Sequence, residues 1–240
     1  KVKNCIFECK TKALKIVVLT GAGMSAESGV STFRDAGGLW EGHDVMEVAS
    51  PQGWEKNPQL VLEFYNQRRR QLHQVQPHAG HLALSALQNK YQVQIVTQNV
   101  DNLHERAGSQ QVLHLHGELM KVRSTGNDNY IVPWENDLNW GDTCPSGFQL
   151  RPHIVWFGEA VPAMHQAITM VERAEVVVVI GTSLQVYPAA GLLNYAASTT
   201  PIFYIDPKPA AVNHFGRNIQ VIPETAGKGV PLFIEKLNQL

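Results

Sequence analysis

The sequence predicts an α/β protein with a doubly wound, mostly parallel, Rossmann-like sheet and a smaller inserted module. Several short β-branched runs are apolar throughout, which is typical of strands covered on both faces. Helix-like stretches separate these runs, and each run stops at small or polar residues. Strands that alternate with helices in this way indicate a parallel sheet with helices on both faces.

Four apolar runs predict the buried strands. In doubly wound sheets, ligands bind beyond the carboxyl ends of the strands. Because Gly, Thr, Ser, Asn, Gln or Asp follows each run, we expect a ligand-binding edge at those ends. The runs are residues 16–19, 94–97, 176–180 and 203–205.

Helical patterns cover residues 78–89, 163–174 and 188–197. Two segments break the alternation of strand and helix. Residues 41–77 are helical in character with no clear strand, and residues 121–149 are rich in Asn, Asp, Gly and Trp. We therefore expect a small module of residues 41–77 and 121–150. The sheet domain then takes residues 11–40, 78–120 and 151–240.

The composition excludes several classes of protein. The 240 residues carry 20 Lys+Arg against 21 Asp+Glu, and this near-neutral charge argues against direct binding to nucleic acid. No apolar run approaches the ~20 residues that span a bilayer, and residues 1–12 lack the apolar stretch of a secretory signal. Three cysteines (Cys5, Cys9 and Cys144) are too few for a disulfide framework. We expect a cytoplasmic monomer that does not bind membranes.

A glycine-rich loop follows the first strand. Gly21-Ala22-Gly23-Met24-Ser25-Ala26 fits the dinucleotide pattern G-x-G-x-x-G/A, in which backbone amides approach a pyrophosphate at a helix N-terminus. The acidic residue that hydride-transfer enzymes place about 20 positions later is absent. Phe33 and Arg34 follow instead, either in a surface loop or in a loop that covers a cofactor. The pattern predicts a bound nucleotide used outside redox chemistry.

Two histidines alternate in the segment Val112-Leu113-His114-Leu115-His116-Gly117, so both face one side of a short strand. Three interpretations remain open at this point. The histidines are structural, or they bind a metal whose third ligand is not evident, or one of them is a general base near neutral pH.

The sequence resembles the sirtuins, which are NAD-dependent protein lysine deacylases, along nearly all its length. Six blocks carry this resemblance in the family's order. They are Gly21-Ala22-Gly23-Met24-Ser25-Ala26-Glu27-Ser28-Gly29, Thr32-Phe33-Arg34, Thr97-Gln98-Asn99-Val100-Asp101-Asn102-Leu103-His104, Leu115-His116-Gly117, Val155-Trp156-Phe157-Gly158-Glu159 and Gly181-Thr182-Ser183-Leu184.

The resemblance implies an NAD site and a peptide site. It places the diphosphate of NAD at Gly21, Ala22, Gly23, Ala26 and Arg34, and the nicotinamide under Phe33. It places the ribose and nicotinamide at Gln98, Asn99 and Asp101. It places the adenosine half at Gly181, Thr182, Ser183, Asp206 and Ala226, although the family often has Asn where this chain has Asp206. It places the extended substrate peptide at Val155, Phe157, Gly158, Glu159 and Val186.

The resemblance also implies the chemistry. In the family's reaction the acyl-lysine oxygen is itself the nucleophile, so no Ser or Cys nucleophile is required. Asn99 and Asp101 hold the nicotinamide, and His116 is the base that takes a proton from a ribose hydroxyl. The products are nicotinamide, O-acyl-ADP-ribose and free lysine.

Tyr65 and Arg68 indicate which acyl group the protein prefers. At i and i+3 they project from one helix face, and an Arg with a Tyr hydroxyl can clamp a carboxylate. The alternative is that Arg68-Arg69-Arg70 forms a solvated helix face. Tyr-x-x-Arg resembles the bacterial sirtuin subgroup that removes succinyl, malonyl or glutaryl groups. We therefore expect a preference for acidic acyl groups with some deacetylation.

The structural zinc of most sirtuins is not expected here. The family binds it with two Cys pairs after His-Gly, whereas this insertion contains Cys144 alone. One thiolate cannot build a closed tetrahedral site. We expect a zinc-free module packed by Tyr130, Ile131, Trp134, Leu138 and Trp140.

Two other functions remain as alternatives. A serine hydrolase would use Ser183, Asp206 and His214, but Gln185 replaces the final Gly of the nucleophile turn. A catalytically silent NAD-binding module would keep the glycine loop but would not need His116, Tyr65 or Arg68, so their joint presence favours an enzyme.

Overall fold

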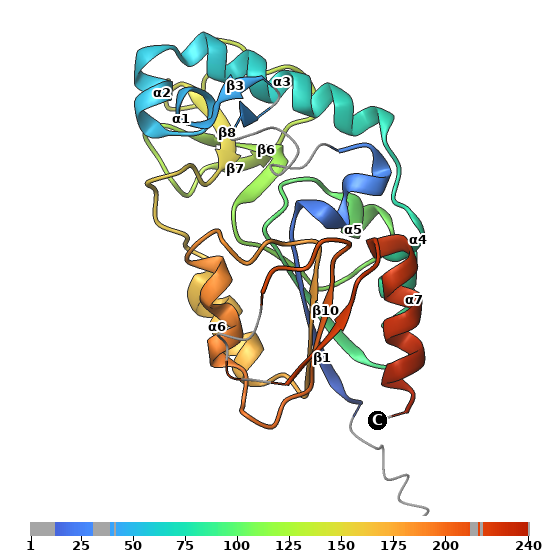
Figure 1. Cartoon of the computed structure of the whole chain (residues 1–240). Helices are drawn as coiled ribbons and strands as arrows, with labels where there is room; N and C mark the ends of the chain where they lie inside the picture. The colour runs from blue at the N-terminus through green and yellow to red at the C-terminus, as the bar shows by residue number, and fades with distance from the viewer. Residues whose placement is uncertain (1–12, 31–38, 41, 212–215, 217, 240) are drawn as a thin grey trace, which may run out of the picture.

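A six-stranded parallel sheet has the strand order β11-β10-β9-β1-β4-β5. It lies between flanking helices in the lower part of the view in Figure 1. The computed structural model describes residues 13–30, 39–40, 42–211, 216 and 218–239. The strands are β1 (Lys15–Thr20), β4 (Gln92–Thr97), β5 (Val112–His114), β9 (Val176–Ile180), β10 (Ile202–Ile205) and β11 (Ile219–Ile222). The predicted fold class and the four predicted strands are confirmed.

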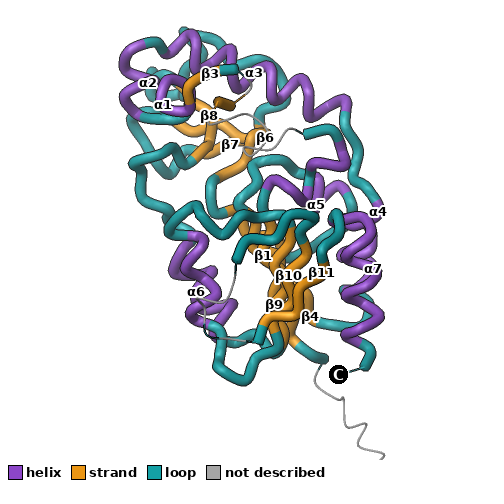
Figure 2. Tube along the Cα trace, viewed as in Figure 1, coloured by secondary structure: helices purple, strands orange, loops and turns teal. Residues whose placement is uncertain are grey.

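Helices cover both faces of this sheet (Figure 2), which explains why its strands are apolar throughout. Ile16 and Val18 face the core beneath α4 (Ala79–Leu87) and α7 (Ala226–Leu237). Val17 and Leu19 face the opposite core, beneath α6 (Met164–Glu172) and the 3₁₀ helix η4 (Ala189–Tyr195). Successive residues of one strand are therefore buried in two different cores.

Several predicted elements differ in detail from the structure. The segment 188–197 is a 3₁₀ helix, and the chain after Val112 leaves the sheet at His114. It turns at Gly117, whose φ of 83° suits glycine, and then enters the small module. Helix α7 was not predicted, because Pro231 interrupts its pattern.

The small module joins a helical layer to an antiparallel sheet. Its sheet has the order β7-β6-β8, and a two-stranded ribbon pairs β2 with β3. Strand β8 pairs with β6. Because β6 begins before residue 121 and β8 ends after residue 150, the sheet extends beyond the predicted bounds of the second module segment. The helices are α1 (Val45–Val48), α2 (Pro51–Lys56) and α3 (Pro58–Gln74). The strands are β2 (Leu39–Trp40), β3 (His43–Asp44), β6 (Gly117–Ser124), β7 (Ile131–Pro133) and β8 (Leu150–Ile154).

The packing of the module corrects part of the sequence prediction. Leu138 is buried, and Tyr130 and Trp134 pack against its cluster, as expected. Ile131 and Trp140 are 41% and 58% exposed, so their predicted place in the core is wrong. Buried residues from α3, β6 and β8 fill the core instead, together with Cys144. These residues are Leu62, Val122 and Leu150.

In the described part of the chain, none of the helices combines the length and apolar character required to cross a bilayer.

Candidate active site

The carboxyl ends of β1, β4 and β9 meet at one edge of the sheet. Thr20 pairs in register with Thr97 on one side and with Ile180 on the other. The loops that follow these three residues therefore leave the sheet side by side at the same edge, as the sequence predicted. A cavity of about 460 Å³ opens there, between the sheet and the small module.

The cavity collects many of the predicted site residues. From the strand ends come Ala22, Gln98, Asn99, Asp101, His116, Ser183 and Val186. From the small module and the segment after β8 come Tyr65, Arg68, Val155, Phe157, Gly158 and Glu159. Gly21, Gly23, Ala26, Gly181, Thr182, Asp206 and Ala226 lie outside its lining. Phe33, Arg34 and His214 lie outside the described residues.

The glycines of the loop allow the backbone after β1 to approach the backbone after β9 closely. The Gly23 amide donates to the Gly181 carbonyl at 2.8 Å. A Cβ on Gly23 would lie 2.7 Å from the Gly181 Cα, which is too close for any side chain. The α-helix expected after the loop is replaced by two 3₁₀ turns, η1 (Ala22–Met24) and η2 (Ala26–Ser28), and Gly29 ends the second turn at a φ of 93°.

The predicted adenosine-side residues also lie near the strand ends. The Thr182 hydroxyl accepts from Gln98 Nε2 at 3.2 Å, and the Thr182 carbonyl accepts from the Tyr204 hydroxyl. Asp206 follows β10 and is buried, and its Oδ1 accepts from the Lys208 amide. Ala226 begins α7 and is also buried.

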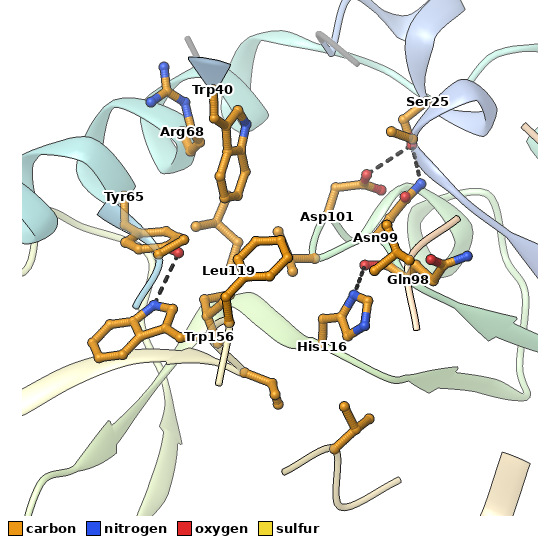
Figure 3. A pocket seen from close by; sticks show the side chains of 18 of the residues that line it. Ser25, Trp40, Tyr65, Arg68, Gln98, Asn99, Asp101, His116, Leu119 and Trp156 are labelled. Carbon is orange, nitrogen blue, oxygen red and sulfur yellow. Dashed lines mark hydrogen bonds between the residues drawn. The ribbon is translucent and has the colours of Figure 1, made fainter. Parts of the chain in front are cut away.

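A buried polar network fixes the loop after β4 (Figure 3). Asn99 Nδ2 donates to Ser25 Oγ and to the Gly21 carbonyl, both at 3.0 Å. Ser25 in turn donates to Asp101 Oδ2 at 2.8 Å. Burial raises the pKa of Asp101, although bonds from the Leu103 amide and Ser25 oppose that shift. Ser25 was missed as a functional residue, and its place inside the glycine pattern was the available signal.

His116 presents a basic nitrogen to the cavity. Its Nδ1 lies 3.0 Å from the Gln98 carbonyl. A carbonyl oxygen only accepts, so Nδ1 carries the proton and Nε2 keeps its lone pair. Burial lowers the pKa of His116, and the bond to Gln98 opposes this shift.

His114 has a different environment and does not line the cavity. Its Nδ1 lies 2.9 Å from the Asn99 carbonyl, and its Nε2 lies 2.8 Å from Glu105. Burial lowers the pKa of His114, but the bond to Glu105, the charges of Glu105 and Glu118 and the bond to the Asn99 carbonyl together outweigh it, so the net shift is upward. Glu118 approaches the same Nε2 at 3.9 Å. The sequence spacing did not indicate these two carboxylates, because they meet His114 only in the fold.

The far end of the cavity holds Tyr65 and Arg68. Tyr65 is fully buried, and its hydroxyl oxygen accepts from Trp156 Nε1 at 3.1 Å. Arg68 Nη1 donates to the Phe64 carbonyl, and its guanidinium lies 4.3 Å from the centre of the Phe64 ring. Both residues line the cavity, so one helix face presents them as predicted.

The alternative of a solvated arginine face is wrong for Arg69. Only 1% of Arg69 is exposed, because it donates inward to the Leu119 carbonyl and to Asn66. Arg70 does lie in solvent, where it pairs with Glu63 and Asp137. The three arginines thus point in different directions.

The residues predicted to bind the peptide include exposed side chains at the cavity and one side chain that hydrogen bonds hold in place. Phe157 and Val186 are 43% and 40% exposed at the cavity. The Phe157 amide donates to the Ala49 carbonyl at 2.9 Å. Glu159 accepts from Arg151, Arg123 and the Trp156 amide, so its side chain braces the segment.

Comparisons with known proteins agree with this geometry. The model of the Sir2 family matches residues 21–188. An NAD-dependent protein deacylase of Helicobacter pylori is 58% identical over 225 residues, which cover 94% of this chain and 98% of that protein. The chain belongs to the Sir2 family, and the resemblance to the sirtuins is confirmed.

Two solved structures show the same fold. A mutant Sir2 homologue in complex with ADP-ribose superimposes with a TM-score of 0.85 at 36% identity, and the match covers 95% of this chain and 93% of that one. A Sir2 homologue in complex with NAD gives a TM-score of 0.84 at 36% identity, with 95% and 90% covered.

The residues present here fit NAD. The cavity volume lies in the range of cofactor sites, and one end carries a buried carboxamide, carboxylate and hydroxyl from Asn99, Asp101 and Ser25. Such groups can bind the carboxamide and the hydroxyls of a nicotinamide riboside.

Proposed function

We propose that this chain is an NAD-dependent protein lysine deacylase that prefers acidic acyl groups. One observation supports this most directly. A single cavity has His116 and the Asn99–Ser25–Asp101 network at one end and Tyr65 at the other. NAD would supply an electrophilic ribose carbon and accept the acyl group, and with one water molecule the products would be nicotinamide, O-acyl-ADP-ribose and free lysine.

The polar end of the cavity holds the nicotinamide side of NAD. Asn99 and Asp101 bind its carboxamide, and Ser25 keeps both side chains in place. His116 takes a proton from a ribose hydroxyl at Nε2, because Nδ1–H is committed to Gln98. Gly21, Gly23, Gly181, Asp206 and the other predicted residues at the strand ends bind the remainder of the dinucleotide.

Tyr65 and Arg68 select the acyl group. The Tyr65 hydroxyl and the Arg68 guanidinium both donate, and a carboxylate only accepts. A carboxylate bound there replaces the Phe64 carbonyl as the acceptor of Arg68 Nη1. An acetyl group ends in a methyl and leaves the Tyr65 hydroxyl proton without an acceptor, which costs about 1–3 kcal/mol for a buried group. Succinyl and malonyl groups are therefore preferred, and some deacetylation remains.

The peptide that carries the lysine binds along the exposed rim at Phe157, Gly158 and Val186. Gly158 has a φ of 90°, and a Cβ there would meet open space, so the backbone conformation is what requires glycine. An extended peptide can add to this segment by backbone hydrogen bonds.

The test is NAD-dependent nicotinamide release from an acylated lysine peptide. Release that requires both NAD and the peptide supports the proposal. Peptide deacylation without NAD, together with covalent labelling of Ser183 by a fluorophosphonate, would support a serine hydrolase instead. Binding of NAD without turnover on any acyl peptide would indicate a silent binding module.

A further inference from the structure

Trp156 and Tyr65 meet at the acyl end of the cavity, although they lie 91 positions apart in the chain. The indole Nε1 donates to the phenol oxygen at 3.1 Å (Figure 3). Trp156 is 2% exposed and Tyr65 is fully buried. This bond therefore forms out of contact with bulk solvent.

The direction of this bond decides where the Tyr65 proton goes. An indole N–H donates only, so Trp156 cannot accept the proton of the Tyr65 hydroxyl. No side chain or carbonyl among the described residues accepts that proton either. Burial raises the pKa of Tyr65, so the hydroxyl keeps its proton at every working pH. Because Tyr65 lines the cavity, the proton is available to a group bound inside it.

The indole is held firmly in the orientation that this bond needs. The Arg151 guanidinium lies 3.2 Å from the centre of the Trp156 ring, and Trp54 packs at 5.7 Å from it. Glu159 accepts from Arg151 at 2.7 Å and from the Trp156 amide at 2.8 Å. Cation–π contact and charge-assisted bonds together limit the rotation of the indole.

We propose that Trp156 is a positioning residue that determines acyl specificity through Tyr65. Its N–H binds the phenol oxygen and directs the phenol proton toward an acyl group that ends in an acceptor, such as a carboxylate. Donation to the oxygen also polarises the O–H and strengthens its own donation. This inference rests on the proposed preference for acidic acyl groups.

The test compares kcat and KM for succinyl-lysine and acetyl-lysine peptides of one sequence. The proteins are the wild type, Trp156→Phe, Tyr65→Phe and the double variant. Trp156→Phe should lower the ratio of succinyl to acetyl kcat/KM by about fivefold, the scale of one neutral hydrogen bond. The loss should appear mainly as a higher KM for the succinyl peptide. In the Tyr65→Phe background the same change should leave the ratio nearly constant.

Two controls separate this role from packing. Trp54→Phe disturbs the same aromatic cluster without touching the bond to Tyr65, so it should leave the ratio as it is. Replacing Trp156 with benzothienylalanine keeps both fused rings but puts sulfur in place of the N–H. It should lower the ratio as Trp156→Phe does, and it remains testable if the phenylalanine variant does not fold.

The outcomes distinguish the inference from the proposed function. A ratio that falls in Tyr65→Phe but not in either Trp156 variant overturns the role of Trp156 and keeps the acyl preference. If neither Tyr65→Phe nor Arg68→Met alters the succinyl-to-acetyl ratio of kcat/KM, the carboxylate clamp is refuted, and this inference with it.

Discussion

His116 donates its Nδ1 proton to the Gln98 carbonyl across 3.0 Å, and this one bond fixes which nitrogen is basic. Gln98 is the first residue after β4, and His116 comes two residues after β5. The parallel pairing of Thr97 with His114 brings the two segments together. The sheet register thus sets the tautomer of the proposed base.

Replacing His116 tests its role as the base. His116→Ala should reduce kcat by about a hundred to ten-thousandfold, the usual contribution of general base catalysis. NAD binding should stay largely intact, because the Asn99–Ser25–Asp101 network does not use His116. Single-turnover kinetics and calorimetric titration with NAD measure the two quantities. Near-normal turnover in His116→Ala or His116→Tyr would refute this assignment.

The pH dependence of kcat/KM, which reports the pKa values of the free enzyme, should show the burial of this histidine. Only the deprotonated Nε2 can accept a proton, so activity rises with pH through the pKa of His116. Burial lowers that pKa, so the acid limb should lie below the ordinary value of about 6.5. A profile of kcat/KM between pH 5 and 9 measures the limb. An acid limb well above neutrality would contradict the observed environment.

Arg68 should matter more for succinyl than for acetyl substrates. Arg68→Met keeps the length of the side chain but removes the charge and every donor. The succinyl-to-acetyl ratio of kcat/KM should fall about tenfold to a hundredfold, since bonds to charged groups contribute about 1.5–3 kcal/mol. Arg70→Met is the matched control, because Arg70 is exposed and pairs with Glu63. Equal losses on both substrates in Arg68→Met would argue against the clamp.

Stability should decrease in mild acid because of two buried histidines. Burial lowers the pKa of His81 to about 2 and that of His104 to about 4. Below the unfolded-state pKa of about 6.5, the unfolded chain gains protons that the folded chain cannot bind. Each histidine then costs about 1.4 kcal/mol per pH unit until its folded-state pKa is reached.

The readout for this effect is the slope of stability against pH. Urea unfolding of the wild type and of His81→Gln at pH 7, 6 and 5 gives both slopes. Between pH 7 and pH 5 the wild type should lose about 2 kcal/mol more stability than His81→Gln, whatever the substitution costs at pH 7. Identical slopes would show that the pKa of His81 is not lowered in the folded state.

Much of the fold could be predicted because its signals are local. The apolar runs around Val18 and Val178 are buried on both faces, and such runs predict parallel strands from the sequence alone. The edge strand β11 was missed because two of its residues are exposed and Gln220 interrupts its apolar run, whereas β10, of the same length, is apolar and buried throughout. The 3₁₀ turns after Gly21 were also missed, since the same motif commonly precedes an α-helix.

The site was less predictable where it depends on long-range packing. The motifs gave His116, Asn99 and Asp101, but nothing in the local sequence pairs Trp156 with Tyr65. Arg69 turns inward, whereas Arg68 lines the cavity and Arg70 lies in solvent, and this inward turn depends on the carbonyl of Leu119 from another segment. Such contacts depend on how α3 packs against β6 and the segment after β8, and no local motif determines that packing.

The most direct test of the central claim is nicotinamide release followed by mass spectrometry. Matched succinyl-lysine and acetyl-lysine peptides are compared with and without NAD. We predict NAD-dependent release on both peptides, with the higher kcat/KM on succinyl-lysine and the acyl group recovered on ADP-ribose. Faster turnover of acetyl-lysine would contradict the acidic-acyl preference, and no NAD-dependent release on either peptide would contradict the deacylase assignment itself.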